Sequence, residues 1–221
     1  MACCLFLTGV ILIVGPVLQN SFNSRNREST LRKYNLSLQK TDLEAEKEKA
    51  RRYNEKLREN SSYPPEEYIR TLNITEGILG ILCIPKINLE LPIYHGIEDE
   101  VLAKGAGHMP NSSFPLAESG THTVLTGHTG YPGAELFTNL TQLEVGDEFQ
   151  LLVLDEILIY RVDQIKIVLP DQLEGLAPVL GQDYCTLVTC TPYGVNSHRL
   201  LIRGKREQQE KAPREQGSLW S

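Results

Sequence analysis

The sequence predicts a mainly β protein with a helical extension before it. Short apolar runs separated by Gly, Pro and Asn fill residues 77–204, with few helical patterns between them. Strands that recur at short intervals favour an antiparallel barrel or a sandwich. The chain of 221 residues, 41% of them hydrophobic, is sufficient for one domain with appendages.

The first element is an uncharged apolar run from Ala2 to Leu18. It is slightly short of the ~20 residues that span a bilayer, and no small-residue cleavage site follows it. We therefore expect residues 1–20 to be a transmembrane signal anchor. Positive charges begin only at Arg25, which taken alone would keep the rest of the chain in the cytoplasm. We expect further basic residues upstream of the present start, which would reverse that orientation.

Residues 21–76 are expected to form a helical stalk that includes a candidate lid region. Leu43, Ala50 and Leu57 are spaced seven apart, and Glu48 can pair with Arg52 one helical turn later. This pattern predicts one long, solvated spacer helix over residues 29–60. The segment NSSYPP then ends it, because its two prolines lack backbone donors and fix the backbone.

The main domain is expected to cover residues 77–204. Its expected strands are 78–84, 89–94, 122–126, 148–154, 158–169, 184–189 and 198–203. Residues 102–106 and 134–140 are expected to form short helical turns. The remaining residues, 205–221, are polar and are expected to be a disordered tail.

Composition and charge exclude several classes of function. A formal net charge of -6 argues against binding of nucleic acid, because phosphate backbones attract clustered Lys and Arg. Five cysteines are too few and too scattered to hold together a fold of this length. No Cys-x-x-Cys or close Cys/His cluster is present, so we expect neither zinc nor another metal, and no cofactor.

The string TLVTC, residues 186–190, places a lone thiol where a strand gives way to a turn. A free cysteine is more often a buried core residue. A cysteine nucleophile, in contrast, must be accessible and must form a thiolate, which nearby cations favour. The position of Cys190 at a strand end favours this second interpretation.

His128 and Arg199 are the candidate partners of Cys190. His128 lies in LTGHTG, just past an expected strand and between two glycines that allow a tight turn. Arg199 begins the strand after Cys190, and antiparallel pairing of these two strands would bring the guanidinium close to the thiol. His128 could then act as general acid and base, and Arg199 could stabilise an oxyanion.

His198 is an alternative partner to His128. It precedes Arg199 in the same strand, so the two side chains should point to opposite faces and only one can face Cys190. We expect His95, His108 and His122 to be structural or surface residues.

At this point the chain resembles the sortases, the membrane-anchored cysteine transpeptidases of Gram-positive bacteria. The resemblance covers residues 77–204 and lies in TLVTC, TPYGVNSHRLLIRG, LTGH, GILCIPKINLELPIYHG, GAGHMP and ELFTNL. It implies an eight-stranded sortase-type β-barrel. It also implies that Cys190 is the nucleophile, His128 the general acid and base, and Arg199 the residue that orients the substrate and its oxyanion.

The stretch after Cys190 and the N-terminal extension are most similar to the class C sortases, which build pili. This resemblance implies cleavage of an LPxTG-like sorting signal between Thr and Gly through a thioester, and transfer of the acyl group to a pilin lysine. It also implies a single-pass membrane protein with an extracellular catalytic domain. The class C lid motif, Asp-Pro-aromatic, is not matched by NSSYPPEEY, in which Tyr63 and Pro64 are the candidate lid residues.

Three alternatives remain at the level of the sequence. The protein could be a sortase that anchors surface proteins to peptidoglycan, or a cysteine hydrolase that only releases peptide. It could also be a membrane-anchored β-domain without catalysis. This last alternative predicts a Cys190 thiol of ordinary reactivity that is insensitive to removal of His128.

Overall fold

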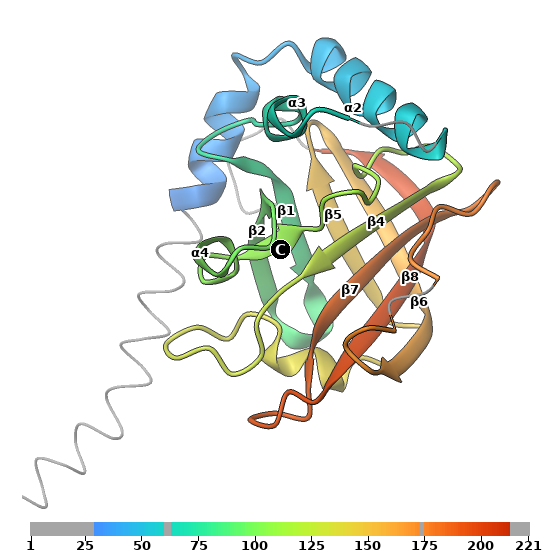
Figure 1. The fold of residues 1–221 in the computed structure, drawn as a ribbon. Helices are drawn as coiled ribbons and strands as arrows, with labels where there is room; N and C mark the ends of the chain where they lie inside the picture. Colours follow the sequence, from blue (N-terminus) through green and yellow to red (C-terminus); the bar gives the residue numbers. More distant parts are fainter. Residues whose placement is uncertain (1–28, 60–62, 173–174, 213–221) are drawn as a thin grey trace, which may run out of the picture.

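The computed structural model describes residues 29–59, 63–172 and 175–212 (Figure 1). The strands are β1 (Ile78–Ile84), β2 (Leu89–His95), β3 (Ala106–His108), β4 (Thr121–Thr126), β5 (Glu148–Val153), β6 (Glu156–Val168), β7 (Asp183–Thr191) and β8 (His198–Lys211). The helices are α2 (Leu43–Arg58), α3 (Pro65–Arg70) and α4 (Asp99–Leu102), with 3-10 turns η1 (Pro85–Ile87) and η2 (Thr138–Gln142). A further helix covers residues 29–38.

The expected mainly β fold is confirmed: the eight strands close into a barrel in the order β1-β2-β3-β4-β7-β8-β6-β5. The expectation of a purely antiparallel sheet was wrong, because β2 pairs with β3 and β4 pairs with β7 in parallel. Parallel neighbours need a crossover connection. Between β4 and β7 this crossover contains β5 and β6, which build the far side of the barrel.

Three element predictions were wrong. The short strand β3 was not predicted, because Ala-Gly-His contains no apolar run, and the turn expected at 102–106 is replaced by α4 and the start of β3. Residues 205–211 are not a disordered tail: they extend β8 and pair with the first half of β6. Pairing with a neighbouring strand outweighs their polar composition. The turn expected at 134–140 lies at η2.

The N-terminal segment is packed on the barrel and is not a solvated stalk. Two helices with a break at residues 39–42 replace the single long helix, and Asp42 caps the second one through the Ala45 N–H. Ala50 of α2 is fully buried, and Leu43 and Leu57 pack against the core. Tyr34 is also fully buried, and its hydroxyl donates to the Leu79 carbonyl. The apolar spacing of seven therefore marks a docking face.

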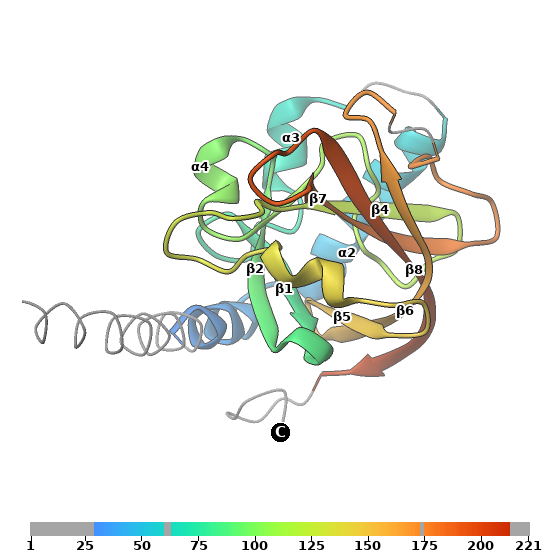
Figure 2. The ribbon, with the colours of Figure 1, turned by 90° about the horizontal axis from the view of Figure 1, so that it is seen from below.

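Helices α2 and α3 lie over one end of the barrel, whereas the connection from β7 to β8 lies at the opposite end (Figure 1). Viewed from below, α2 lies behind the strands (Figure 2). The expected anchor at residues 1–20 lies outside the described residues. Within the described part of the chain, no helix has the length and apolar character needed to cross a bilayer.

Candidate active site

Cys190 and Arg199 are directly opposite each other on paired strands. The antiparallel register of β7 and β8 aligns Cys190 with Arg199 and Val188 with Leu201. Residues that face each other in an antiparallel pair project their side chains to the same side of the sheet. The register thus places the sulfur and the guanidinium on one face, as the sequence predicted.

The parallel pairing of β4 with β7 brings His128 to the same place. Thr126 is the partner of Val188, and the Gly127 N–H donates to the Val188 carbonyl at 3.1 Å. Two residues further along each strand, the same register places His128 beside Cys190. The Thr189 hydroxyl donates to the Gly127 carbonyl at 2.7 Å and lies 2.6 Å from the Thr129 hydroxyl. Thr189 therefore fastens the His128 loop to β7 on both sides of the histidine.

The two glycines of this loop are required for different reasons. Gly130 has φ +71°, which glycine adopts without strain, and a Cβ there would meet the Tyr193 ring at 2.8 Å. Gly127 does not have a positive φ; a Cβ at this position would instead lie 2.8 Å from the Phe137 ring. Gly127 thus allows close packing, not a turn.

Cys190 lies on the outer face of the barrel wall. Cys185 and Leu187 of β7 belong to the barrel core, whereas Val188 packs in a separate outer apolar cluster, and side chains alternate along a strand. This outer apolar cluster comprises buried Val124, Val188 and Leu201, with Met109, Val168 and Leu176 packed against it. Cys190 is partly exposed and free, and it lies next to this cluster. It is accessible, as a nucleophile must be.

His128 is partly buried, with its side chain 27% exposed, and its ring stacks on Tyr131 with centroids 5.4 Å apart. Asp99 Oδ1 is 3.9 Å from His128 Nε2, too far for a hydrogen bond. The Asp99 side chain is 99% exposed, so water screens its interaction with the imidazole. Sequence reasoning did not find Asp99, which carries no motif signal.

Arg199 is held by backbone carbonyls. Its Nη1 donates to the carbonyls of Asn196 at 3.2 Å and His198 at 3.1 Å. In the described ranges no carboxylate lies within 4 Å of this guanidinium. Its charge is therefore not neutralised by an acidic side chain, and it is available to an oxyanion or a substrate carbonyl.

The other expected structural histidines are buried inside hydrogen-bond networks. His108 is fully buried, stacks on Phe114 and contacts the Tyr68 hydroxyl through Nδ1, while burial lowers its pKa to about 3. His122 contacts the Ala177 carbonyl and the Thr186 hydroxyl, and burial lowers its pKa to about 4. No three described His, Cys, Asp and Glu side chains are grouped to hold a metal ion.

His198 and the candidate lid residues lie as follows. His198 is opposite Thr191, and its Nδ1 is 2.9 Å from the Ser197 hydroxyl. Tyr63 packs edge-on against Tyr53 of α2, and the Lys56 ammonium lies 5.0 Å from the centre of its ring. Pro64 is the N-cap of α3. A lid role for Tyr63 and Pro64 stays a prediction.

Comparison with known proteins identifies the family. Residues 82–207, more than half of the chain, match the Sortase domain family model. The chain belongs to the sortase family. The predicted resemblance is thus confirmed, and with it the membership of a family of cysteine transpeptidases. The roles of Cys190, His128 and Arg199 stay predictions that the strand registers support.

This sortase is similar to solved structures along most of its length. It shares 39% identity with sortase C1 of Streptococcus agalactiae, with a TM-score of 0.77 over 81% of this chain and 98% of that one. Sortase C of Streptococcus pneumoniae is 38% identical, with a TM-score of 0.72 over 84% of this chain and 99% of that one. These similarities confirm the eight-stranded sortase-type barrel.

A curated relative has a different class name. Sortase D of Bacillus subtilis is 32% identical over 130 residues, which are 58% of this chain and 63% of that protein. The chain thus matches less than two thirds of the length of this relative.

Proposed function

We propose that this sortase cleaves an LPxTG-like sorting signal between Thr and Gly and transfers the acyl group to a lysine amine of a pilin subunit. One observation carries the proposal: two strand registers bring Cys190, Arg199 and the His128 loop to the same end of the barrel. Sulfur, imidazole and guanidinium are the groups that acyl transfer through a thioester requires.

The reaction proceeds in two steps. The Cys190 thiolate attacks the threonine carbonyl carbon, and the Arg199 guanidinium stabilises the oxyanion that forms. The carbon–nitrogen bond to glycine breaks as the His128 imidazolium donates a proton to the leaving amine, which leaves a thioester on Cys190. A neutral lysine amine then attacks the thioester carbon, His128 accepts its proton, and the thiolate is released.

The outer apolar cluster is the proposed floor for the apolar part of the sorting signal. Val188 and Leu201 precede Cys190 and follow Arg199 by two residues each, so they continue the same face of the sheet. An extended peptide whose threonine carbonyl meets Cys190 would lay its leucine and proline on this strip. Burial of such side chains contributes about 1.5–3 kcal/mol each.

Similarity to two class C enzymes supports the pilin acceptor over peptidoglycan. The structure of sortase C of Streptococcus pneumoniae provided insights into the pilin substrate specificity of that enzyme. For the present chain we propose the same class of acceptor. We further propose an N-terminal membrane anchor and an extracellular catalytic domain, supported by the uncharged run from Ala2 to Leu18.

The test uses the full chain with a labelled LPxTG-type peptide, with and without a lysine-containing pilin peptide. We expect a cross-linked product that contains both peptides. Cys190→Ala should abolish its formation, His128→Ala should slow it about 10²–10⁴-fold, and Arg199→Ala about 10²–10³-fold.

His198→Ala is the matched control, because His198 lies at the same end of the barrel. The sequence also offered His198 as the alternative to His128 as the partner of Cys190. It should retain near-normal activity. Release of hydrolysed peptide alone, whatever amine is supplied, would contradict the transferase proposal and leave a cysteine hydrolase.

A further inference from the structure

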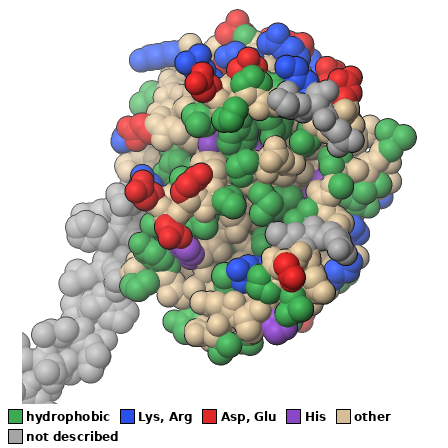
Figure 3. All heavy atoms as spheres, viewed as in Figure 1, with side chains coloured by type: hydrophobic (Ala, Val, Ile, Leu, Met, Phe, Trp, Pro, Cys, Tyr) green, Lys and Arg blue, Asp and Glu red, His purple; other side chains and the backbone are tan. Residues whose placement is uncertain are grey.

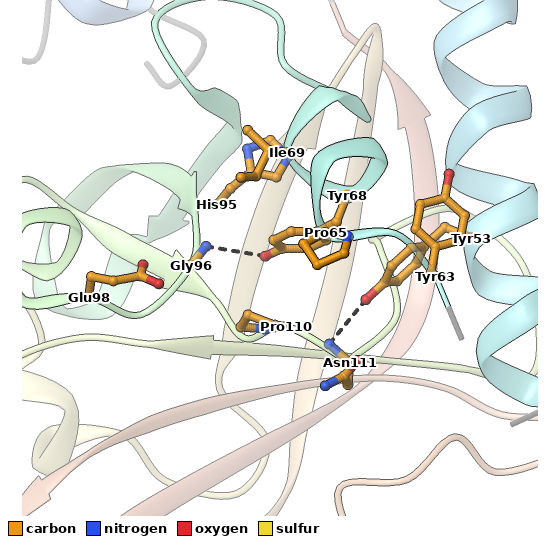
Figure 4. Close-up of a pocket in the computed structure, with 10 residues that line it drawn as sticks. All are labelled: Tyr53, Tyr63, Pro65, Tyr68, Ile69, His95, Gly96, Glu98, Pro110 and Asn111. Carbon is orange, nitrogen blue, oxygen red and sulfur yellow. Dashed lines mark hydrogen bonds between the residues drawn. The ribbon is translucent and has the colours of Figure 1, made fainter. Parts of the chain in front are cut away.

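An open pocket lies between α3, the residues that follow β2 and the residues that follow β3. Its volume is about 290 Å³. The side chains that give it its apolar walls are mostly tyrosine and proline rings (Figure 4): Tyr53, Tyr63, Pro65, Tyr68, Ile69 and Pro110. None of these residues belongs to the proposed catalytic group or to the outer apolar cluster.

The inner wall of the pocket is held in place before any ligand binds. The Tyr68 hydroxyl donates to the His108 carbonyl at 2.9 Å and accepts from the Gly96 N–H at 3.2 Å. The Tyr53 hydroxyl accepts from the Asn111 N–H at 3.1 Å, and both rings pack against Phe114. Ordering these rings therefore costs a ligand little free energy.

The mouth of the pocket is acidic. Glu98 lines it, and Figure 4 shows its carboxylate near Gly96. Among the residues that the structure describes, no cation lies within ion-pair distance of Glu98. Asp99 and Glu100 follow in the chain and are exposed, and acidic side chains gather over α4 in Figure 3. The mouth thus favours a positively charged ligand.

The acidic residues Glu98, Asp99 and Glu100 also connect the pocket to the proposed catalytic group. Glu98 lines the pocket, and the next residue, Asp99, reaches to within 3.9 Å of His128. A peptide anchored in the pocket can therefore pass His128 within a few residues. The three buried residues of the outer apolar cluster lie on β4, β7 and β8, and no residue of the cluster lines the pocket, although Met109 at its edge precedes Pro110.

We propose that this pocket anchors the acceptor peptide, with a proline or aromatic side chain between the tyrosine rings and the reacting lysine beside it at His128. Extended proline-rich segments dock into grooves lined by aromatic rings, and the acidic mouth attracts the lysine. Ile69, 53% exposed at the pocket, adds an apolar contact. This assignment rests on the proposed transfer to a lysine amine.

The experiment compares two acceptor peptides on the full chain, one with Ala-Pro-Lys and one with Gly-Gly-Lys, while the same LPxTG-type donor is supplied. We expect a lower KM for the proline-containing acceptor. Ile69→Ala and Glu98→Gln should each raise that KM about fivefold or more and leave donor hydrolysis without acceptor unchanged.

Ile97→Ala and Glu100→Gln are the controls, because both residues are exposed in the same turn but do not line the pocket. These two control variants should leave the KM for the Ala-Pro-Lys acceptor and the KM for the Gly-Gly-Lys acceptor unchanged. Binding of the proline-containing peptide to Cys190→Ala, followed by fluorescence anisotropy, should weaken in the same two pocket variants.

Two failures are distinguishable. If no amine ever becomes linked to the donor, the proposed transfer itself is wrong. If transfer occurs, but the pocket variants match the wild type in KM and in peptide binding, the acceptor pocket is overturned and the transfer stands.

Discussion

A single hydroxyl group, that of Thr189, links β7 to the loop that carries His128. It donates to the Gly127 carbonyl and receives a hydrogen bond from the Thr129 hydroxyl, at 2.7 and 2.6 Å. Thr189 is nearly completely buried, at 3% exposure. Its contacts lie one residue before and one residue after His128, so it acts on catalysis by positioning that side chain.

Replacing Thr189 with valine keeps the shape of the side chain and removes the hydroxyl. We expect Thr189→Val to lower kcat about tenfold with little change in the KM for the sorting signal, because His128 loses its fixed position. The free energy of unfolding should fall by about 1–3 kcal/mol, since the Gly127 carbonyl loses its partner.

Thr186→Val is a matched control on the same strand, where the hydroxyl contacts His122. This variant should lose stability and keep its kcat. Equal losses of kcat in both variants, measured by steady-state transfer assays and urea unfolding, would contradict a positioning role for Thr189.

The residues of the candidate site differ in how far the sequence could predict them. Cys190 and Arg199 follow from alternating strand patterns and a connection of ordinary length, which place them in neighbouring antiparallel strands. The contacts of Thr189 and Asp99 could not be predicted, because they depend on the parallel pairing of β4 with β7 and on the position of α4. No local pattern shows either feature.

At the scale of elements, one buried amide adds to the apolar packing that holds α2 on the barrel. The Asn54 side chain donates to the Phe114 carbonyl at 3.0 Å and accepts from the Phe114 N–H at 2.8 Å. It therefore satisfies both backbone groups of a residue that packs against Tyr53 and Tyr68. This helix carries Tyr53 of the acceptor pocket.

Asn54→Leu should destabilise the protein by about 2–4 kcal/mol, because two buried backbone groups of Phe114 lose their partners. Urea unfolding of the full chain measures this loss. Arg52→Leu, at an exposed position of the same helix, should change stability by less than about 0.5 kcal/mol. Similar midpoints for both variants would show that α2 does not depend on Asn54.

The helical extension shows where sequence patterns fall short. The spacing of Leu43, Ala50 and Leu57 identified the apolar face of α2. One apolar residue in every seven, however, is also compatible with a solvent-exposed helix. The pattern also does not show the contact of Asn54 with Phe114, because a buried asparagine looks polar in sequence. In the same way residues 205–211 look like a polar tail, although β6 pairs with them.

For the molecule as a whole, buried histidines and one buried acid set the response to pH. Burial lowers the pKa of His122 to about 4 and that of His108 to about 3, and it also lowers the pKa of His95. Burial raises the pKa of Asp183 to about 6, although Arg206 pairs with it and lowers it in part.

Stability should therefore fall as the pH drops from about 7 towards 4. Each buried histidine is neutral in the fold, whereas the unfolded chain binds a proton below about 6.5, which costs about 1.4 kcal/mol per pH unit. Asp183 acts in the opposite sense between about 4 and 6, because its raised pKa favours the folded state at low pH.

His122→Gln isolates one histidine of this response. Between pH 6 and 4.5 its free energy of unfolding should depend on pH less steeply than in the wild type, by about 1.4 kcal/mol per unit. Identical slopes for the variant and the wild type in urea unfolding would contradict the assignment of His122.

The parallel ladder between β4 and β7 has an evolutionary consequence. Six residue pairs from Thr121 and Asp183 to Thr126 and Val188 fix the separation of imidazole and sulfur, although 61 positions divide His128 from Cys190 along the chain. The segment between β6 and β7 can therefore gain or lose residues without disturbing the chemistry. Natural variation or grafting there can retune which peptide is accepted while the reaction stays the same.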